Sequence, residues 1–216
     1  MTKKIALVSD FDGTISDNDF FYYLAEKYFD QAMLEPWNQY LSGQKKHFEA
    51  LNEMFSQLHI SPEELKKFIS GIKIDKTFYS VLKFCKNENI PVYICSAGCD
   101  YYIKELLRDN IEKYNLHIVS NNGTYSPVCG LQMSPNKEFF DENLGVSKTN
   151  LIKHLKENRF FVVFCGDGRP DVGPALLADK VFARKTLYQE CLNKKIAVEL
   201  LQNFNQVKNF LEENIK

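Results

Sequence analysis

Short apolar runs, each closed by charged or turn-forming residues, recur along this chain of 216 residues. Such runs predict buried strands, and we expect them at residues 5–8, 92–95, 118–119 and 160–165, with a weaker candidate at 181–183. Between them, apolar residues recur at helical spacing, which predicts helices at residues 78–88, 100–108, 148–157 and 204–213. Strands that alternate with helices are typical of an α/β fold, in which a mainly parallel sheet has helices on both faces.

Residues 16–77 follow a different pattern, with apolar and aromatic residues at helical spacing and no buried-strand run. The sequence Ser61-Pro62-Glu63-Glu64 within this segment is typical of the beginning of a helix. We therefore predict a small helical cap at residues 16–77 and an α/β core made of residues 1–15 and 78–216. The aromatic residues of the cap would form mainly its own core, with one or two facing a ligand. Residues 120–145 predict a hairpin and loops.

Acidic residues follow two of the expected strands. Asp10 and Asp12 close the first run, and their side chains share one face because residues two apart on a strand point the same way. Asp167 and Asp171 follow the run at 160–165. In parallel sheets, ligands bind outside the carboxyl ends of the strands, so these carboxylates should lie together. Clustered acids that offer only oxygen ligands suit a hard divalent cation, above all Mg²⁺.

Residues suited to a phosphate group accompany these acids. Ser96, Ala97 and Gly98 follow the second run, and their hydroxyl and amide groups can approach an anion closely. Lys148 stands at the start of an expected helix. Phosphoryl transfer needs mainly such positioning and charge neutralisation. The set therefore predicts phosphoryl transfer, with one of the first two aspartates as nucleophile and the other managing the proton of the leaving group.

Each of these residues alone also has a common structural explanation. A lone aspartate often caps a helix or closes a turn, a lysine is usually solvent-exposed, and Ser96 is a candidate cap for the helix that begins near Asp100. The order of the residues beside separate strands of one sheet favours the functional interpretation.

Composition narrows the choice of partners. The chain has 27 Lys and Arg against 28 Asp and Glu, a net charge of -1, so we expect no nucleic-acid partner. No apolar stretch is long enough to span a bilayer or to form the core of a signal peptide; we expect no membrane partner and a cytoplasmic location. The six cysteines form no C-x-x-C pair, which indicates small buried residues and no zinc site. Cys95 and Cys99, which flank the Ser96 loop, are the candidates for a reactive thiol.

Four motifs, in this order along nearly the whole chain, resemble those of the phosphatase branch of the haloacid dehalogenase superfamily. They are Asp10-Phe11-Asp12-Gly13-Thr14-Ile15, Ser96, Lys148 and Gly166-Asp167-Gly168-Arg169-Pro170-Asp171. The resemblance implies a Rossmann-like core with a helical cap between the first two motifs. It also implies that Asp10 is a nucleophile that forms an aspartyl-phosphate, and that Asp12 acts as general acid and then as base.

The same resemblance implies the ligands of the site. Mg²⁺ would be held by Asp10, the main-chain carbonyl of Asp12 and Asp167, with Asp171 in support. Ser96 and Lys148 would hold the phosphate, with help from the amides of Ala97 and Gly98.

Within the superfamily, the chain is most similar to the phosphoserine-phosphatase-like group. The nearest branch is that of the 2-hydroxy-3-keto-5-methylthiopentenyl-1-phosphate phosphatases, and residues 179–184 and 188–191 carry this closer similarity. Phosphoserine phosphatases have a glutamate where this chain has Asp19, an asparagine where it has Pro170, and an arginine in the cap, whereas no arginine precedes Arg108 here. A carboxylate clamp without arginine is poorer, which argues against phosphoserine. The cysteine-rich loop of the methylthiopentenyl branch is absent from residues 120–145.

We therefore expect a Mg²⁺-dependent phosphatase of a small phosphorylated metabolite. The alternatives are a phosphoserine phosphatase, a phosphotransferase that shields its intermediate from water, and a non-catalytic metabolite-binding or regulatory protein on the same fold. Asp19, at the entrance of the cap, is the candidate contact to the substrate beyond its phosphate. Its alternative role is to cap the helix that begins near Phe20.

Overall fold

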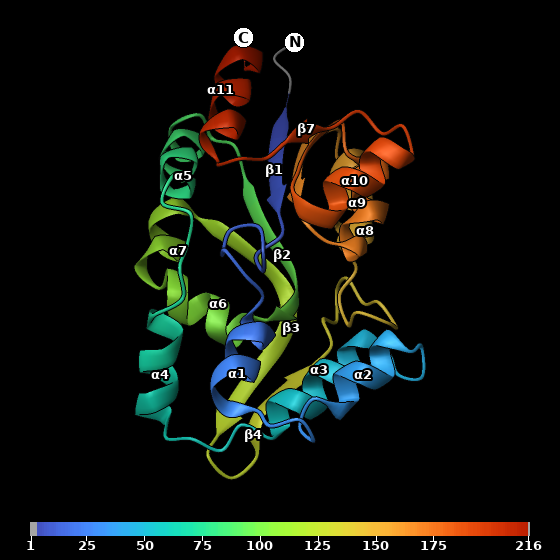
Figure 1. Cartoon of the computed structure of the whole chain (residues 1–216). Helices are drawn as coiled ribbons and strands as arrows, with labels where there is room; N and C mark the ends of the chain where they lie inside the picture. Colours follow the sequence, from blue (N-terminus) through green and yellow to red (C-terminus); the bar gives the residue numbers. More distant parts are fainter. Residues whose placement is uncertain (1–3, 216) are drawn as a thin grey trace.

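Seven strands form one sheet in the computed structural model, which describes residues 4–215 (Figure 1). The strands are β1 (Ile5–Ser9), β2 (Val92–Cys99), β3 (Leu116–Ser126), β4 (Gly130–Ser134), β5 (Phe161–Gly166), β6 (Lys180–Ala183) and β7 (Glu199–Leu200). They lie in the order β4-β3-β2-β1-β5-β6-β7, and all neighbours are parallel except the hairpin β3–β4. The predicted α/β class is confirmed, and all five expected strands are present.

Two apolar clusters pack on the two faces of this sheet. Along β1, Ile5 and Leu7 belong to one cluster, and Ala6 and Val8 to the other, because successive side chains of a strand point to opposite faces. The first face carries α5 (Phe78–Asn87), α6 (Asp100–Leu107), α7 (Asp109–Tyr114) and α11 (Asn205–Asn214). The second carries α8 (Lys148–Glu157), α9 (Val172–Leu177) and α10 (Lys185–Asn193). Helices on both faces were predicted. No helix within residues 4–215 is long and apolar enough to cross a membrane.

The strands depart from the sequence prediction in two places. The strand expected at residues 118–119 extends from Leu116 to Ser126, because its second half pairs with β4 as the arm of a hairpin. That arm contains Asn122, Gly123 and Thr124, so it gives no apolar run. The short strand β7 was missed, since both of its residues are exposed.

Residues 16–77 hold four helices: α1 (Phe20–Tyr28), α2 (Glu35–Leu41), α3 (His47–Ser56) and α4 (Pro62–Ser70). As expected, α4 begins at Ser61-Pro62, and the Ser61 hydroxyl accepts a hydrogen bond from the Glu64 N–H. An isolated bridge between Ser16 and Ile74 joins the two ends of the segment. The division into a cap at residues 16–77 and a core at residues 1–15 and 78–216 stays a prediction, and residues 1–3 and 216 lie outside the described chain.

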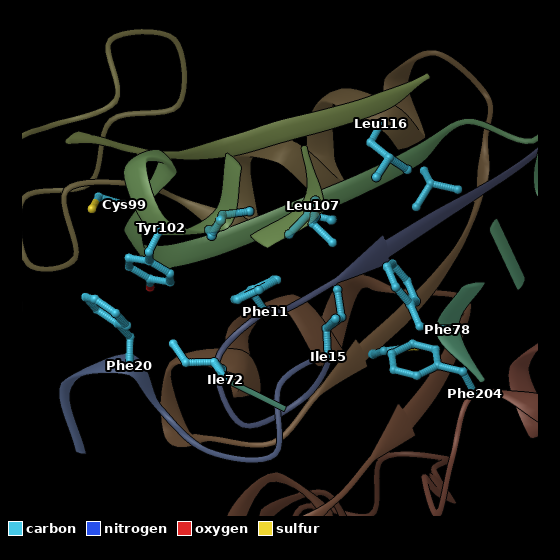
Figure 2. Packing of buried hydrophobic residues seen from close by; sticks show 14 of the residues in the cluster. Phe11, Ile15, Phe20, Ile72, Phe78, Cys99, Tyr102, Leu107, Leu116 and Phe204 are labelled. Atoms are coloured by element: carbon cyan, nitrogen blue, oxygen red, sulfur yellow. The ribbon is translucent and has the colours of Figure 1, made fainter. Parts of the chain in front are cut away.

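The aromatic residues of this helical segment do not form a separate core. Phe20, Leu24 and Phe55 belong to the same apolar cluster as Phe11 and the buried residues of α5 and α6. Figure 2 shows Phe20 beside Tyr102 of α6, and their rings are stacked with centroids 4.1 Å apart. A unit of about sixty residues is only marginally stable alone, and this segment packs against α6 and the β3–β4 hairpin. The aromatic residues are thus core residues, as expected, but the core is shared with the sheet and is not confined to the helical segment.

Candidate active site

The loops that follow β1, β2 and β5 meet at the centre of the sheet. The register places Ser9, the last residue of β1, opposite Cys165 of β5, so these two strands end side by side. It also places Ser9 opposite Ile94 of β2, so Ser96 follows two residues beyond that point. The polar residues near these strand ends are therefore neighbours in space, although Asp10 and Asp171 are 161 positions apart in the sequence. This is the position at which parallel sheets bind ligands.

Asp10 lies immediately after β1, and the backbone around it is fixed. Its N–H donates to the Cys165 carbonyl at 2.9 Å. Its carboxylate accepts from the Phe11 N–H at Oδ1, at 2.7 Å, and pairs with the Lys148 ammonium at Oδ2, also at 2.7 Å. Burial raises the pKa of Asp10 well above its usual value, as does the charge of Asp171, whereas Lys148 opposes the shift. An ionised Asp10 therefore needs positive charge beside it.

Lys148 is a buried member of the site, unlike a typical surface lysine. It is the first residue of α8, whose preceding residue Ser147 caps the helix by accepting from the Asn150 N–H. Its Nζ lies 2.7 Å from Asp10 Oδ2 and 2.6 Å from Asp171 Oδ1. Burial alone would lower the pKa of Lys148, but the charges of Asp10 and Asp171 outweigh it and raise the pKa. The ammonium therefore stays charged between the two carboxylates.

Asp10, Asp167 and Asp171 form an acidic cluster. One carboxylate oxygen of each lies within 4.8 Å of those of the other two. Asp171 Oδ2 also accepts from the N–H groups of Asp167 and Gly168, at 3.0 and 3.1 Å, which fixes the turn after β5. Burial raises the pKa of Asp167, while the nearby Lys185 opposes the shift. Buried donors that offer only carboxylate oxygens fit a hard divalent cation such as Mg²⁺.

Asp12 is not a member of this acidic cluster, and its carboxylate has partners of its own. Its Oδ2 accepts from the hydroxyls of Ser96 and Tyr102, at 2.9 and 2.5 Å, and its Oδ1 accepts from the Phe20 N–H at 3.0 Å. Burial raises the pKa of Asp12, although these three hydrogen bonds oppose the rise. A carboxyl group that is rigidly held and easily protonated suits a general acid.

Tyr102 is a residue of the site that the sequence did not reveal. It lies on α6 and looks like a core residue there, and it is indeed fully buried. Its hydroxyl donates the shortest of the three hydrogen bonds that Asp12 accepts, and its ring stacks on the ring of Phe20. The sequence signal was limited to an aromatic pair, Tyr101 and Tyr102, at the start of a helix three residues after Gly98.

The expected phosphate loop forms the irregular end of β2, where the register shifts between Ser96 and Cys99. The Ser96 hydroxyl accepts from the Gly98 N–H at 2.9 Å, and the Ala97 carbonyl accepts from the Asn121 side chain, also at 2.9 Å. Ser96 does not cap α6, because Cys99 occupies the cap position. Cys95 and Cys99 are buried, and burial raises the pKa of the Cys95 thiol to about 12. These thiols are therefore small packing groups.

Gly98→Ala should disable this loop. A Cβ atom at Gly98 would lie 1.7 Å from the Tyr102 hydroxyl and 3.0 Å from Asp12 Oδ2, so both side chains would have to move. We expect turnover of phosphomonoesters to fall about 100-fold, the usual consequence of a displacement near 1 Å in a catalytic group. The unfolding free energy should fall by about 1–3 kcal/mol. Gly71→Ala is the matched control, since its Cβ would meet nothing closer than 3.3 Å. Near-normal turnover in Gly98→Ala would show that this packing has no role in catalysis.

A cavity opens above these residues, between the strand ends and the helical segment. It is lined by Asp10, Asp12, Asp19, Phe20, Phe21, Trp37, His47, Leu51, Phe55, Ser96, Ala97, Gly98, Tyr102, Lys148, Asp167, Gly168 and Pro170. All the predicted site residues except the fully buried Asp171 line it. One or two aromatic residues of the helical segment were expected to face a ligand. Four line the cavity, Phe20, Phe21, Trp37 and Phe55, together with the apolar Leu51.

Asp19 lies at the cap position of α1, but its side chain makes no capping hydrogen bond. The carboxyl group lines the cavity instead. Burial raises the pKa of Asp19 to about 7, with further contributions from the charges of Asp12 and Asp167. The helix-capping interpretation is therefore wrong, and the contact to a substrate stays a prediction.

Known proteins share both the sequence and the fold. Residues 7–175 match the family model described as haloacid dehalogenase-like hydrolase. The chain belongs to this family. The predicted family and enzyme class are thus confirmed. This hydrolase is 27% identical over 211 residues to a 2-hydroxy-3-keto-5-methylthiopentenyl-1-phosphate phosphatase of Bacillus cereus strain G9842, over 97% of this chain and 96% of that protein. A Bacillus anthracis protein of the same name matches equally well.

Solved structures share the fold of this hydrolase. A substrate-bound phosphoserine phosphatase superposes with a TM-score of 0.71 at 18% identity, over 97% of this chain and 99% of that one. A hydrolase of the same family from Salmonella enterica serovar Typhi gives a TM-score of 0.73 at 16% identity, over 100% of this chain and 72% of that one. At these identities the likeness is one of fold.

Proposed function

We propose that this chain is a Mg²⁺-dependent phosphatase that hydrolyses a small phosphomonoester through an aspartyl-phosphate. The observation that carries the proposal is the pairing of two aspartates with different surroundings at the end of β1. Asp10 lies against Lys148 and the other acids, whereas Asp12 lies against three hydrogen-bond donors. Such a division supports two different chemical roles.

Asp10 would act as the nucleophile. Its carboxylate oxygen attacks phosphorus, and the bond from phosphorus to the ester oxygen of the substrate breaks. Lys148, 2.7 Å from Asp10, supports this step by offsetting the negative charge of the carboxylate and the phosphoryl group. The hydroxyl of Ser96 and the amides of Ala97 and Gly98 are the further groups proposed to bind phosphate.

Asp12 would manage the protons of both steps. In the first, it gives a proton to the departing ester oxygen, which its raised pKa favours. In the second, the ionised Asp12 takes a proton from the water that attacks the aspartyl-phosphate. Inorganic phosphate leaves, and the carboxylate of Asp10 is restored.

Asp10, Asp167 and Asp171 are the side chains proposed to hold or support Mg²⁺, together with the main-chain carbonyl of Asp12. When bound, Mg²⁺ would supply positive charge to the phosphate and to Asp10. These residues suit Mg²⁺ because their three carboxylates offer oxygen ligands within 4.8 Å of one another. The buried ammonium of Lys148 pairs with two of them, Asp10 and Asp171.

The substrate is proposed to be a small phosphorylated metabolite. The curated relatives are named for 2-hydroxy-3-keto-5-methylthiopentenyl-1-phosphate, and this chain matches them along nearly their whole length. Phosphoserine is less suitable, because among residues 4–215 Lys148 is the one lysine or arginine that lines the cavity, and it is already paired with Asp10 and Asp171. A phosphotransferase stays the alternative on the same site. A cytoplasmic location also stays a prediction.

Removal of divalent cations should abolish activity. The test is hydrolysis of a panel of phosphorylated metabolites, assayed by release of inorganic phosphate after exhaustive chelation and after addition of each cation. We expect less than about 1% of the rate without cation, recovery with Mg²⁺ or Mn²⁺, and inhibition by Ca²⁺, which favours a larger ligand shell. Asp167→Asn should raise the Mg²⁺ concentration needed, whereas the exposed Asp109→Asn should not. Full activity after chelation would remove the cation from the mechanism.

A further inference from the structure

His47 is a cavity residue to which the proposed mechanism assigns no role. It is the first residue of α3, and its N–H donates to the Asn143 side chain at 3.1 Å, which holds the start of the helix in place. The side chain is 9% exposed and lines the cavity that contains Asp10 and Lys148. Its ring contacts Trp37 and Tyr40 edge-on, with centroids 5.6 and 5.1 Å apart.

The ring of His47 carries an unused polar atom. Nδ1 is buried and has no hydrogen-bond partner within residues 4–215. Buried polar atoms of native proteins nearly always have a partner, so a partner that arrives with the substrate would complete the site. Burial lowers the pKa of His47 to about 4, and Lys148 contributes. At neutral pH the ring is therefore an uncharged imidazole, with one donor and one acceptor nitrogen.

The surroundings of His47 restrict what that partner is. Phe21, Trp37, Leu51 and Phe55 also line the cavity, so this end of it is aromatic and apolar. In the described part of the chain, Lys148 is the one lysine or arginine of the lining, and it is paired with Asp10 and Asp171. A carboxylate placed here would lack a counter-ion, which makes its burial costly. An uncharged oxygen on a partly apolar chain fits both His47 and its neighbours.

We propose that His47 is a specificity-determining residue, whose ring forms a hydrogen bond with an uncharged carbonyl or hydroxyl oxygen of the substrate beyond its phosphate. The apolar part of the same leaving group packs against Phe21 and Trp37. This inference rests on the proposed phosphatase function, because it places the leaving group of that reaction beside His47, Phe21 and Trp37.

The test compares esters that differ in one oxygen. The probes are n-pentyl phosphate, 2-oxopentyl phosphate and 4-oxopentyl phosphate, assayed with Mg²⁺. We expect the wild type to prefer at least one oxo ester by about 10-fold in kcat/KM, since a site built for a hydrogen bond discriminates against the analogue that lacks it. His47→Phe keeps an aromatic ring against Trp37 and Tyr40 but removes both nitrogens. It should lose the preference and retain n-pentyl phosphate turnover within about twofold.

Three further variants sharpen the comparison. His47→Asn and His47→Gln place a polar atom near the positions of Nδ1 and Nε2, and one of them should restore part of the preference. His59→Phe is the control, because His59 belongs to the same helical segment but is exposed and does not line the cavity. An equal loss on all three esters in His47→Phe would overturn the proposal, since His47 would then act on cavity shape. Equal wild-type rates on all three esters would overturn it as well.

A binding measurement separates this proposal from the proposed function. In protein with ¹⁵N-labelled imidazole rings, the His47 ring resonance should move on addition of 3-oxohexylphosphonate or 5-oxohexylphosphonate, in which a methylene replaces the ester oxygen. It should not move with n-hexylphosphonate. If the wild type hydrolyses no phosphomonoester, the proposed function fails. A His47 resonance that moves with neither oxo compound would overturn the contact itself.

Discussion

Asp10→Asn is expected to abolish phosphatase activity while the fold is retained. The amide oxygen can still accept from the Phe11 N–H, as Oδ1 does in the wild type at 2.7 Å, but an amide cannot attack phosphorus. Losing a covalent nucleophile should cost several powers of ten in kcat. Phosphate release from the best substrate of the panel measures the loss, and circular dichroism with thermal melting checks the fold.

The control for this variant is Asp109→Asn, which removes the same charge from an exposed position of α7. Its rate should match the wild type. If folded Asp10→Asn kept more than about a tenth of the wild-type rate, Asp10 would not be the nucleophile.

Asp12→Asn should slow both chemical steps, and the defect should depend on the leaving group. An asparagine cannot donate the proton that an alkoxide needs, nor can it activate water. For an alkyl phosphate we expect a loss of about 10²–10⁴-fold, the usual contribution of general acid–base catalysis. The first step should suffer less with p-nitrophenyl phosphate, because p-nitrophenolate departs with little protonation. A rapid burst of about one equivalent of p-nitrophenolate per protein molecule, followed by slow turnover, is then expected.

Rapid-mixing kinetics on the two substrates provides the measurement, and Tyr102→Phe is the companion variant. It removes one hydrogen bond from Asp12 Oδ2 but keeps the ring that stacks on Phe20. It should lose much less activity than Asp12→Asn, since the acid itself remains. Equal defects of Asp12→Asn on both substrates without a burst would contradict the role of Asp12 as proton donor.

The acidic and phosphate-binding candidates could be predicted from sequence because each follows a strand. In a parallel sheet, the end of a strand fixes where the next residues lie, so the apolar runs alone predict that Asp10, Ser96 and Asp167 are neighbours. Lys148 was predictable from its place at the start of a helix, although its burial was not.

The contacts made across elements could not be predicted in this way. His47 and Tyr102 lie on helices at positions that also suit ordinary packing, and their importance comes from partners on other elements. The helix α7 was not predicted either. It is separated from α6 by Arg108, whose φ of +29° interrupts the helical backbone. Helical spacing shows which residues are buried, but it carries no information about the neighbour that each one meets.

The attachment of α1 to the catalytic acid restricts how the cavity can open. Asp12 accepts one hydrogen bond from the Phe20 N–H and another from Tyr102, whose ring stacks on Phe20. A swing of α1 away from the sheet would break the first bond and the stack together, and would leave a buried carboxyl group short of partners. We therefore expect α1 to keep its position relative to the sheet when the cavity opens. Substrate entry and product release would then depend on movement of α2 and α3, which carry Trp37 and His47.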